Sequence, residues 1–358
     1  MTVTSSRGAF GWGCQTAKES VAAISYWHRA HNVDLGIVES REVLDPEVGG
    51  TILPTGLIKT GAHAAGGVDI SPRLEDDIGW LFYGMMGSCA TTADSPENDM
   101  HHHEFTFATD ESSIPWLTLA KWMPGSSATE DIGLRITDAK MAAMRLVLPG
   151  RGRVRMRLDF LGTKPEFLAD PAANASWSTA FEEEDSIPIS AKPSGGFEMP
   201  EGSAVYPMGC VIDFTNGLTD PVRQEGVIGK YYPDDLAVLG RGVIIRFPLK
   251  VTNYDKWSTA IFNVTDASGQ ASFAEWDPIT YSSTFEVNCE SPGLCGTANP
   301  YKLTVYAGEV EWVVDPIVMV GNQPVLVNFT GTVVKPASLT AFKISLENAT
   351  ENYTWPGS

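Results

Sequence analysis

Long apolar runs are missing from this chain of 358 residues. No segment approaches the roughly 20 apolar residues that a helix needs to cross a bilayer. The stretch from Met1 to Cys14 also holds no apolar core of the kind found in signal peptides. We therefore expect no membrane partner.

Cysteine is scarce and scattered. The five cysteines form an odd-numbered set with no repeated spacing: Cys14, Cys89, Cys210, Cys289 and Cys295. Such a set favours reduced, buried thiols over a disulfide framework. Cys289 and Cys295 flank a Pro-Gly loop and could pair, but no feature of the sequence requires it.

Positive charge is in short supply. The chain has 25 Lys and Arg residues against 44 Asp and Glu residues, which gives a net charge of −19. This balance argues against ordinary nucleic-acid binding, which depends on clustered basic residues. It suits a soluble surface, or one that repels DNA. A hydrophobic content of 43 % is enough for packed cores, and the length suggests about two domains.

Catalytic motifs are missing as well. The sequence has no Gly-x-Ser-x-Gly turn, no phosphate loop of the form Gly-x-x-x-x-Gly-Lys-Ser/Thr and no His-Glu-x-x-His zinc motif. We therefore expect no enzyme, no catalytic residues and no cofactor.

Two clusters keep alternatives open. His101, His102 and His103 precede a glutamate, but neighbours on a strand point to opposite faces, so at most two could share a metal. We favour a solvated loop there and expect no metal. The acids Asp76-Asp77 and Glu182 to Asp185 could serve glycoside hydrolysis. Helix capping and solvation explain them without chemistry.

The most informative stretch runs from Gly66 to Met85. Val68 and Ile70 alternate with polar residues, the period of a strand with one buried face. After Pro72 the period becomes helical. Apolar residues then recur at helical spacing, namely Ile78, Leu81, Phe82 and Met85, and the acidic run 75–77 lies in the predicted first turn.

The same order occurs a second time. Val243 and Ile245 alternate with Ile244 and Arg246 in a strand that Pro248 interrupts. Polar residues that suit a helix start follow at Asn253 and Asp255. Trp257, Ala260, Ile261 and Val264 then recur at helical spacing.

A second correspondence holds without a gap. Residues 152–163 match residues 321–332, with Leu158 opposite Val327, Phe160 opposite Phe329 and Gly162 opposite Gly331. In each run one face is apolar and the other mainly polar, which is typical of an antiparallel sheet with one packed and one wet face. These matches predict a duplicated, mainly β domain. The predicted units are an N-terminal arm (1–35), two β domains (36–170 and 201–347), a linker or surface loop (171–200) and a loosely held C-terminal tail (348–358).

Three local expectations complete the prediction. Residues 88–112 look irregular apart from a strand at Phe105 and Phe107. Residues 131–161 look like a β-meander. Asn216-Gly217 is a candidate for a tight hairpin turn.

The first half of the chain resembles the tail tube proteins of long-tailed bacteriophages and related archaeal viruses. The resemblance rests on the order of three motifs: Gly-Cys-Gln-Thr-Ala-Lys-Glu-Ser at 13–20, Gly50-Thr51-Ile52 to Lys59-Thr60-Gly61, and Gly67-Val68-Asp69-Ile70 followed by Asp77-Ile78-Gly79-Trp80-Leu81. The second half looks like a diverged repeat. None of the motifs is a catalytic signature.

The resemblance implies a fold and a set of partners. The fold is a β-sandwich or half-barrel with one flanking helix, whose strands join those of neighbours around a hollow lumen. With two domains per chain, three chains would form a ring of six units, and stacked rings would form the tube that conducts DNA during ejection. The expected partners are further copies of the chain, the tape measure protein, the tail terminator and distal tail or baseplate proteins, with DNA as non-adhering cargo. The expected location is the virion tail, and the host cytoplasm during assembly.

The prediction also assigns residues to a candidate assembly face and to a packing core. The candidate lumen or inter-subunit face comprises Asp69, Arg155, Arg157, Asp159, Arg246, Asn328 and Thr330. The candidate packing core comprises Val68, Ile70, Ile78, Leu81, Phe82, Leu158, Phe160, Val243, Ile245, Trp257, Ile261, Val327 and Phe329.

Several alternatives stay open at this point. The arginines at 151, 153, 155 and 157 could contact phosphate or pair with a neighbour's acids. A carbohydrate-binding or carbohydrate-active β-sandwich is an alternative function. A tail terminator or baseplate ring protein of the same fold is another.

Overall fold

The protein is mainly β, as the sequence predicts. The computed structural model describes residues 8–28, 30–45, 50, 53–54, 56–74, 77–93, 100–110, 114–126, 130–169, 177, 188–189, 197–199, 204–221, 230–251, 254–262, 281–295, 299–321, 323–335 and 341–355. Within these residues the chain forms two short helices and many antiparallel strands. Neither helix has the length and apolar character needed to cross a membrane.

The elements follow one another along the chain in a fixed order. The strands and helices before the midpoint are β1 (Ala9–Cys14), β2 (Tyr26–His28), β3 (Ala30–Val33), β4 (Gly36–Leu44), β5 (Gly56–Ile70), α1 (Ile78–Met86), β6 (Gly87–Ala93), β7 (His101–Phe107), β8 (Leu117–Met123), β9 (Ile132–Pro149) and β10 (Arg155–Ala169). The remaining elements are β11 (Phe197–Glu198), β12 (Ala204–Val205), β13 (Gly209–Leu218), β14 (Val238–Lys250), α2 (Asp255–Phe262), β15 (Tyr281–Cys295), β16 (Asn299–Val314), β17 (Leu326–Val333) and β18 (Phe342–Asn348).

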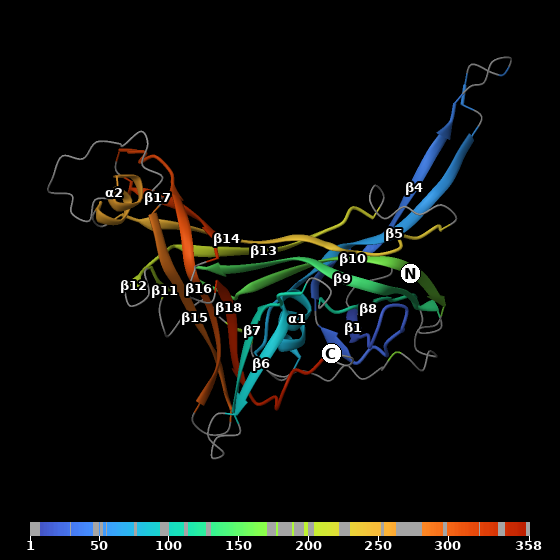
Figure 1. The fold of residues 1–358 in the computed structure, drawn as a ribbon, viewed down its shortest axis with the longest axis horizontal. Helices are drawn as coiled ribbons and strands as arrows, with labels where there is room; N and C mark the ends of the chain where they lie inside the picture. The colour runs from blue at the N-terminus through green and yellow to red at the C-terminus, as the bar shows by residue number, and fades with distance from the viewer. Residues whose placement is uncertain are drawn as a thin grey trace.

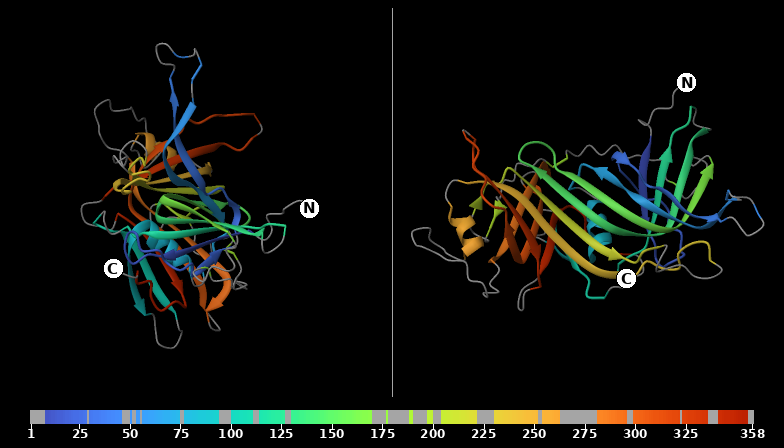
Figure 2. Two further views of the ribbon diagram at one scale, coloured as in Figure 1. Left: turned by 90° about the vertical axis from the view of Figure 1, so that its right-hand side faces the viewer. Right: turned by 90° about the horizontal axis from the view of Figure 1, so that it is seen from above.

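One long antiparallel sheet runs through both halves of the chain (Figures 1 and 2). Its strand order is β4-β5-β10-β9-β13-β14-β17, and the pairing of β9 with β13 joins the halves. We call this the long sheet. At its β4 end the β4–β5 hairpin projects away from the body (Figure 1).

Further strands build the rest of the body. β8, β1 and β2 continue from the first part of β9. A second run of strands has the order β6-β7-β18-β16-β15-β11-β12. Helix α1 contacts β6, β7 and β9, and α2 contacts β15 and β16. Apolar residues from both halves form one continuous core.

The predicted repeat is visible in the strand pairing. β5 leads into α1 and later pairs with β10; likewise β14 leads into α2 and later pairs with β17. We call β4 to β10 the first repeat and β13 to β17 the second repeat. The matched residues Phe160 and Phe329 face Gly66 and Phe247 in the two ladders.

The matched glycines Gly162 and Gly331 serve the same purpose in the two repeats. A Cβ on Gly162 would overlap Ile136 Cγ2, and one on Gly331 would lie 2.5 Å from the Trp312 ring and from Val310. In both strands the missing side chain therefore leaves room for a bulky residue of the neighbouring strand.

The predicted packing residues lie in or against the core. Those of the two ladders and of α1 are buried: Val68, Ile70, Ile78, Leu81, Phe82, Leu158, Phe160, Val243, Ile245, Val327 and Phe329. Trp257 and Ile261 of α2 are partly buried and pack against the same core.

Helix α1 differs from its predicted form. It starts at Ile78 and is buried on nearly all sides, whereas the sequence pattern indicates a single apolar stripe. Asp77 is the N-cap residue but makes no side-chain capping bond, and its Oδ2 lies 3.0 Å from His28 Nε2. No acidic residue lies in the first turn. Glu75 and Asp76 lie outside the described residues.

The prediction of an N-terminal arm is wrong. Phe10 and Trp12 of β1 are fully buried in the core, because β1 pairs with both β2 and β8. Gly11 lies between them and Gly13 follows Trp12; Trp27 and Ile24 fill the space beside Gly11. Residues 8–28 and 30–33 therefore belong to the body.

The prediction of a loosely held C-terminal tail is also wrong. Tyr353 and Trp355 are buried against α1, where the Tyr353 ring occupies the space that a side chain on Gly79 would need. Trp355 Nε1 donates to the carbonyl of Gln15 at 3.0 Å. The predicted linker 171–200 is described only in part, and there Trp177, Ile189 and Phe197 are buried.

Three local predictions need correction. The region 88–112 contains two paired strands, β6 and β7, and the predicted meander is one long strand, β9, followed by β10. Asn216-Gly217 is not a turn: it lies inside β13, where Asn216 Nδ2 donates to the carbonyls of Met85 and Met141 at 3.0 and 3.1 Å. These two hydrogen bonds of the buried Nδ2 group outweigh its turn preference.

The cysteines whose side chains are described agree with the prediction of reduced thiols. Cys14, Cys89, Cys210 and Cys289 are free, and burial raises the pKa of Cys89 to about 11 and of Cys14 and Cys289 to about 12. The side chain of Cys295 lies outside the described residues.

We expect Gly331→Ala to lower the free energy of unfolding by about 1–3 kcal/mol, because the added methyl would overpack the space against Trp312. Urea unfolding measures this change. Gly240→Ala is the matched control, since a Cβ at Gly240 would meet no atom within 4 Å. Equal stability of the two variants would contradict the assigned packing.

His103 makes stability depend on pH. Its Nε2 lies 3.0 Å from Asn348 Oδ1 and its Nδ1 lies 2.9 Å from Thr91 Oγ1, and burial lowers its pKa to about 4. The unfolded chain takes up a proton near pH 6.5 whereas the folded chain stays neutral. We therefore expect the free energy of unfolding to fall as the pH drops from about 6.5 towards 4.

His103→Gln should reduce that slope, most clearly above pH 5, where few carboxylates are protonated. His101→Gln, a change at the half-buried neighbour two residues away, is the control. Parallel unfolding curves for wild type and His103→Gln between pH 6.5 and 5 would rule out the buried neutral imidazole.

Candidate assembly surface

One face of the long sheet is polar and at least partly exposed, and we call it the wet face. A line of charged residues crosses it from strand to strand. Asp69 of β5 is opposite Arg157 of β10, which is opposite Arg145 of β9, which in turn is opposite Asp213 of β13. These are directly paired cross-strand positions, so the side chains share one face.

Arg157 is the centre of the first ion-pair cluster. Its guanidinium lies 2.7 Å from Asp34 Oδ2, 2.9 Å from Asp159 Oδ1 and 3.2 Å from Asp69 Oδ2. The hydrogen bond to Asp34, together with the nearby Asp159, raises the pKa of Arg157 above its usual value. A Cβ at Gly67 would overlap Asp159 and approach the guanidinium, so a glycine there gives the cluster its space.

Asp213 is the centre of the second cluster. Its Oδ1 lies 2.5 Å from Arg145 Nε, and its Oδ2 accepts a hydrogen bond from Arg246 Nη1. The hydrogen bond from Arg145 to Asp213 raises the pKa of Arg145. Arg145 and Arg157 are directly opposite each other, and the carboxylates on both sides of this like-charge pair compensate the repulsion.

The far end of the wet face carries uncharged polar residues. Thr330 is opposite Arg246 in the β14–β17 ladder, and Asn328 is opposite Pro248. Asn328 Nδ2 donates to Asp315 Oδ2 at 3.0 Å. The structure therefore places all seven predicted residues on one face, from β5 to β17.

The predicted set missed three members of these clusters. Arg145, Asp213 and Asp34 were not selected, although two of them carry a signal in the sequence. Arg145 stands between Met144 and Leu146, and Asp213 between Ile212 and Phe214, the same alternation that marks Arg157. Asp34 lies between strands, where no periodicity applies.

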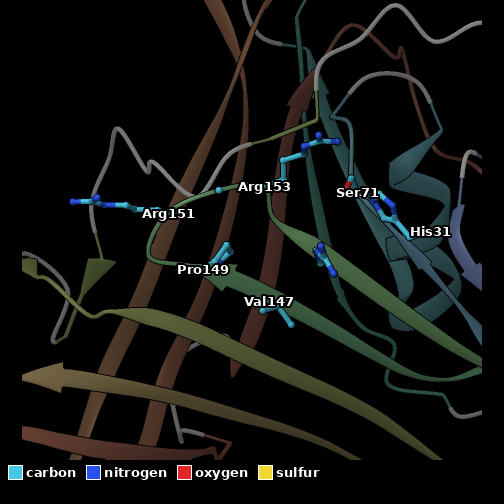
Figure 3. A pocket seen from close by; sticks show the side chains of 8 residues that line it. His31, Ser71, Val147, Pro149, Arg151 and Arg153 are labelled. Atoms are coloured by element: carbon cyan, nitrogen blue, oxygen red, sulfur yellow. Dashed lines mark hydrogen bonds between the residues drawn. The ribbon is translucent and has the colours of Figure 1, made fainter.

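An arginine-rich pocket of about 510 Å³ lies at the β9–β10 turn (Figure 3). It is lined by His31, Ser71, Val147, Pro149, Arg151, Gly152, Arg153 and Arg155. His31 Nε2 and Ser71 Oγ are hydrogen-bonded at 2.8 Å. Arg153 lies on the side of Ser71, whereas Arg151 is directed away from it (Figure 3). Guanidinium groups bind carboxylate and phosphate alike, so the pocket suits either anion.

Exposed apolar side chains gather at two separate places. The first is the β4–β5 hairpin, with Ile37, Val38, Val43, Leu44, Leu57 and Ile58 exposed. The second is the connection between β16 and β17, with Val318, Met319 and Val320 exposed. In the part of the chain that is described, β4 pairs along its length with β5 alone. The outer edge of β4 is therefore an open sheet edge that carries apolar side chains, which is characteristic of interaction surfaces.

The clusters considered for chemistry have ordinary surroundings where they are described. His101, His102 and His103 lie on β7; His102 approaches Glu104 and Glu347, and no group of metal ligands occurs among the described residues. The acids at 182–185 lie outside those residues.

The chain matches no protein-family model and no curated protein sequence.

We expect Arg157→Met to lower the free energy of unfolding by about 1 kcal/mol, because three carboxylates then lack their shared counter-charge. The loss should shrink at high salt, since these groups are partly exposed. Urea unfolding at two salt concentrations tests this. The control is Arg155→Met on the same strand and face, outside the Arg157 cluster, and an equal, salt-independent loss in both variants would contradict the ion-pair role.

Proposed function

We propose that the protein is a structural subunit that assembles with copies of itself into closed rings, and that stacked rings form the tail tube of a long-tailed virus. The observation that supports this most directly is the long sheet. One of its faces is packed, the other is wet, and its outer strand offers an open edge beside exposed apolar side chains. Such an edge is an aggregation hazard unless another chain pairs with it.

Closed assembly removes that hazard. Head-to-tail contacts between identical chains generate a ring when the rotation closes. The duplicated order of strand, helix and strand means that three chains would supply six similar units, the arrangement expected from the family that the sequence resembles. The projecting β4–β5 hairpin would then contact a neighbouring subunit or ring.

The wet face suits a surface that DNA passes without binding. Its arginines at 145, 157 and 246 are paired with carboxylates, so they are not available to bind phosphate, whereas Arg155 of the same face lines the pocket at the β9–β10 turn. The chain as a whole carries a net charge of −19. The remaining partners of this proposal are a tape measure protein, a tail terminator and distal tail or baseplate proteins, and its location is the virion.

The carbohydrate alternative gains no support from the described tryptophans. None of them is exposed, and the indoles of Trp12, Trp27, Trp177, Trp312 and Trp355 are buried. The exposed aromatic rings among the described residues are those of Phe167, Tyr206, Tyr231, Tyr232 and Tyr254. A terminator or baseplate ring would use the same kind of assembly. Copy number per virion, measured by quantitative mass spectrometry, separates a tube with many copies from a ring with few.

The test is assembly of the purified protein. We expect light scattering to show oligomers that grow with concentration, and electron micrographs to show hollow rings or tubes with a channel wide enough for duplex DNA. A particle that stays monomeric at every accessible concentration would refute the proposal. Solid aggregates without a channel would refute the tube while leaving self-association intact.

A further inference from the structure

The chain contains one complete junction between its own repeats. β9 and β13 pair antiparallel from Ala143 to Pro149, with Leu146 directly opposite Ile212. Both of these side chains are buried, at 3 % and 0 % exposed. The junction thus combines backbone hydrogen bonds with a closed apolar contact.

The second repeat contains a counterpart of the β9 side of this junction. Matching Leu158 with Val327 aligns the two ladders, and Leu158 is opposite Met144. The β16–β17 ladder pairs Val313 with Thr330, and beyond β16 the Asp315 N–H donates to the Asn328 carbonyl at 3.0 Å. Continued by one more residue, this register sets Pro316 opposite Val327. Pro316 therefore corresponds to Met144, and Val318 corresponds to Leu146.

The first repeat contains a counterpart of the β13 side. Phe160 and Phe329 are opposite Gly66 and Phe247, so Ala65 corresponds to Arg246. Their partners on the next strand are Gly36 and Val211. One residue further along, Ile37 corresponds to Ile212.

The two counterparts are exposed, although the residues they match are buried. Ile37 is 48 % exposed and Val318 is 68 % exposed. Val38 is 43 % exposed and Met319 is 74 % exposed, whereas Ile317 on the other side of Val318 is partly buried against the core. Residues 315–320 lie in no strand although the matching residues of β9 do, which is expected for a segment that has no partner strand among the described residues.

We infer that residues 36–38 of one chain pair antiparallel with residues 317–319 of a second copy, with Ile37 opposite Val318. The partner we infer is a second copy of the chain, because the equivalent contact between β9 and β13 already joins the two repeats within one chain. The contact joins two different surfaces, so it is head-to-tail and continues around a ring. It ends before Leu35, whose carbonyl accepts a hydrogen bond from Lys121 Nζ at 3.0 Å. The inference rests on the proposed self-assembly and specifies its interface.

The register can be tested by cross-linking between two single variants. Ile37→Cys and Val318→Cys chains are mixed under assembly conditions and oxidised, and we expect a disulfide-linked dimer that needs both variants, since directly opposite residues bring their Cβ atoms within bridging range. The matched control mixes Ile37→Cys with Val320→Cys, two residues out of register on the same segment. Wild-type protein gives the background from its native thiols.

The possible results distinguish an error in the inferred interface from an error in the proposed function. Assembled particles that link at the control pair, or at neither pair, would overturn the inferred junction and leave the proposed function standing. A lack of assembly in the wild type would overturn both.

A charge on the junction gives a second test. We expect Val318→Asp to abolish assembly with an unchanged unfolding midpoint, because the side chain is exposed in the single chain. The control is Val313→Asp, which alters a side chain of similar exposure, 70 %, on β16 outside the junction. Normal assembly of Val318→Asp would contradict the inferred interface.

Discussion

The pairing of β9 with β13 is the interaction on which the rest of this structure depends. It converts two repeats into one sheet, fixes their register and places the apolar faces of both in a single core. Backbone hydrogen bonds make this register strict, since a slip of one residue would turn every side chain to the opposite face. The line of charges from Asp69 to Asp213 exists only because that register is kept.

The electrostatics of the wet face follow from the same constraint. Arg145 and Arg157 lie directly opposite each other on neighbouring strands, and two like charges in these positions repel each other. The sheet brings carboxylates from β5, β10 and β13 to their sides, and the arginine stripe becomes a balanced network. The arginines at the β9–β10 turn, by contrast, line an open pocket.

The repeat, the alternation of the ladders and the polar face could be predicted because they depend on local period. The placement of the chain ends could not. Phe10, Trp12 and Cys14 alternate with Gly11 and Gly13, but this short alternation does not show that β2 and β8 pair with the segment and enclose it. Tyr353 and Trp355 stand in a polar segment; Tyr353 is buried over Gly79, and Trp355 is buried against Trp80 and Tyr83. Asn216 carried a strong turn signal, yet two carbonyls from other elements hold its amide inside a strand. Long-range contacts of this kind leave no local trace.

The burial of Trp355 and Tyr353 against α1 sets the order in which this protein can mature. Strand β7 of the first repeat takes its outer partner from β18, and α1 is covered by the last described residues. The first repeat therefore cannot complete its core until residues 342–355 have been synthesised. A fragment that stops before β18 would leave the outer edge of β7 unpaired and α1 uncovered, with apolar side chains open to other chains.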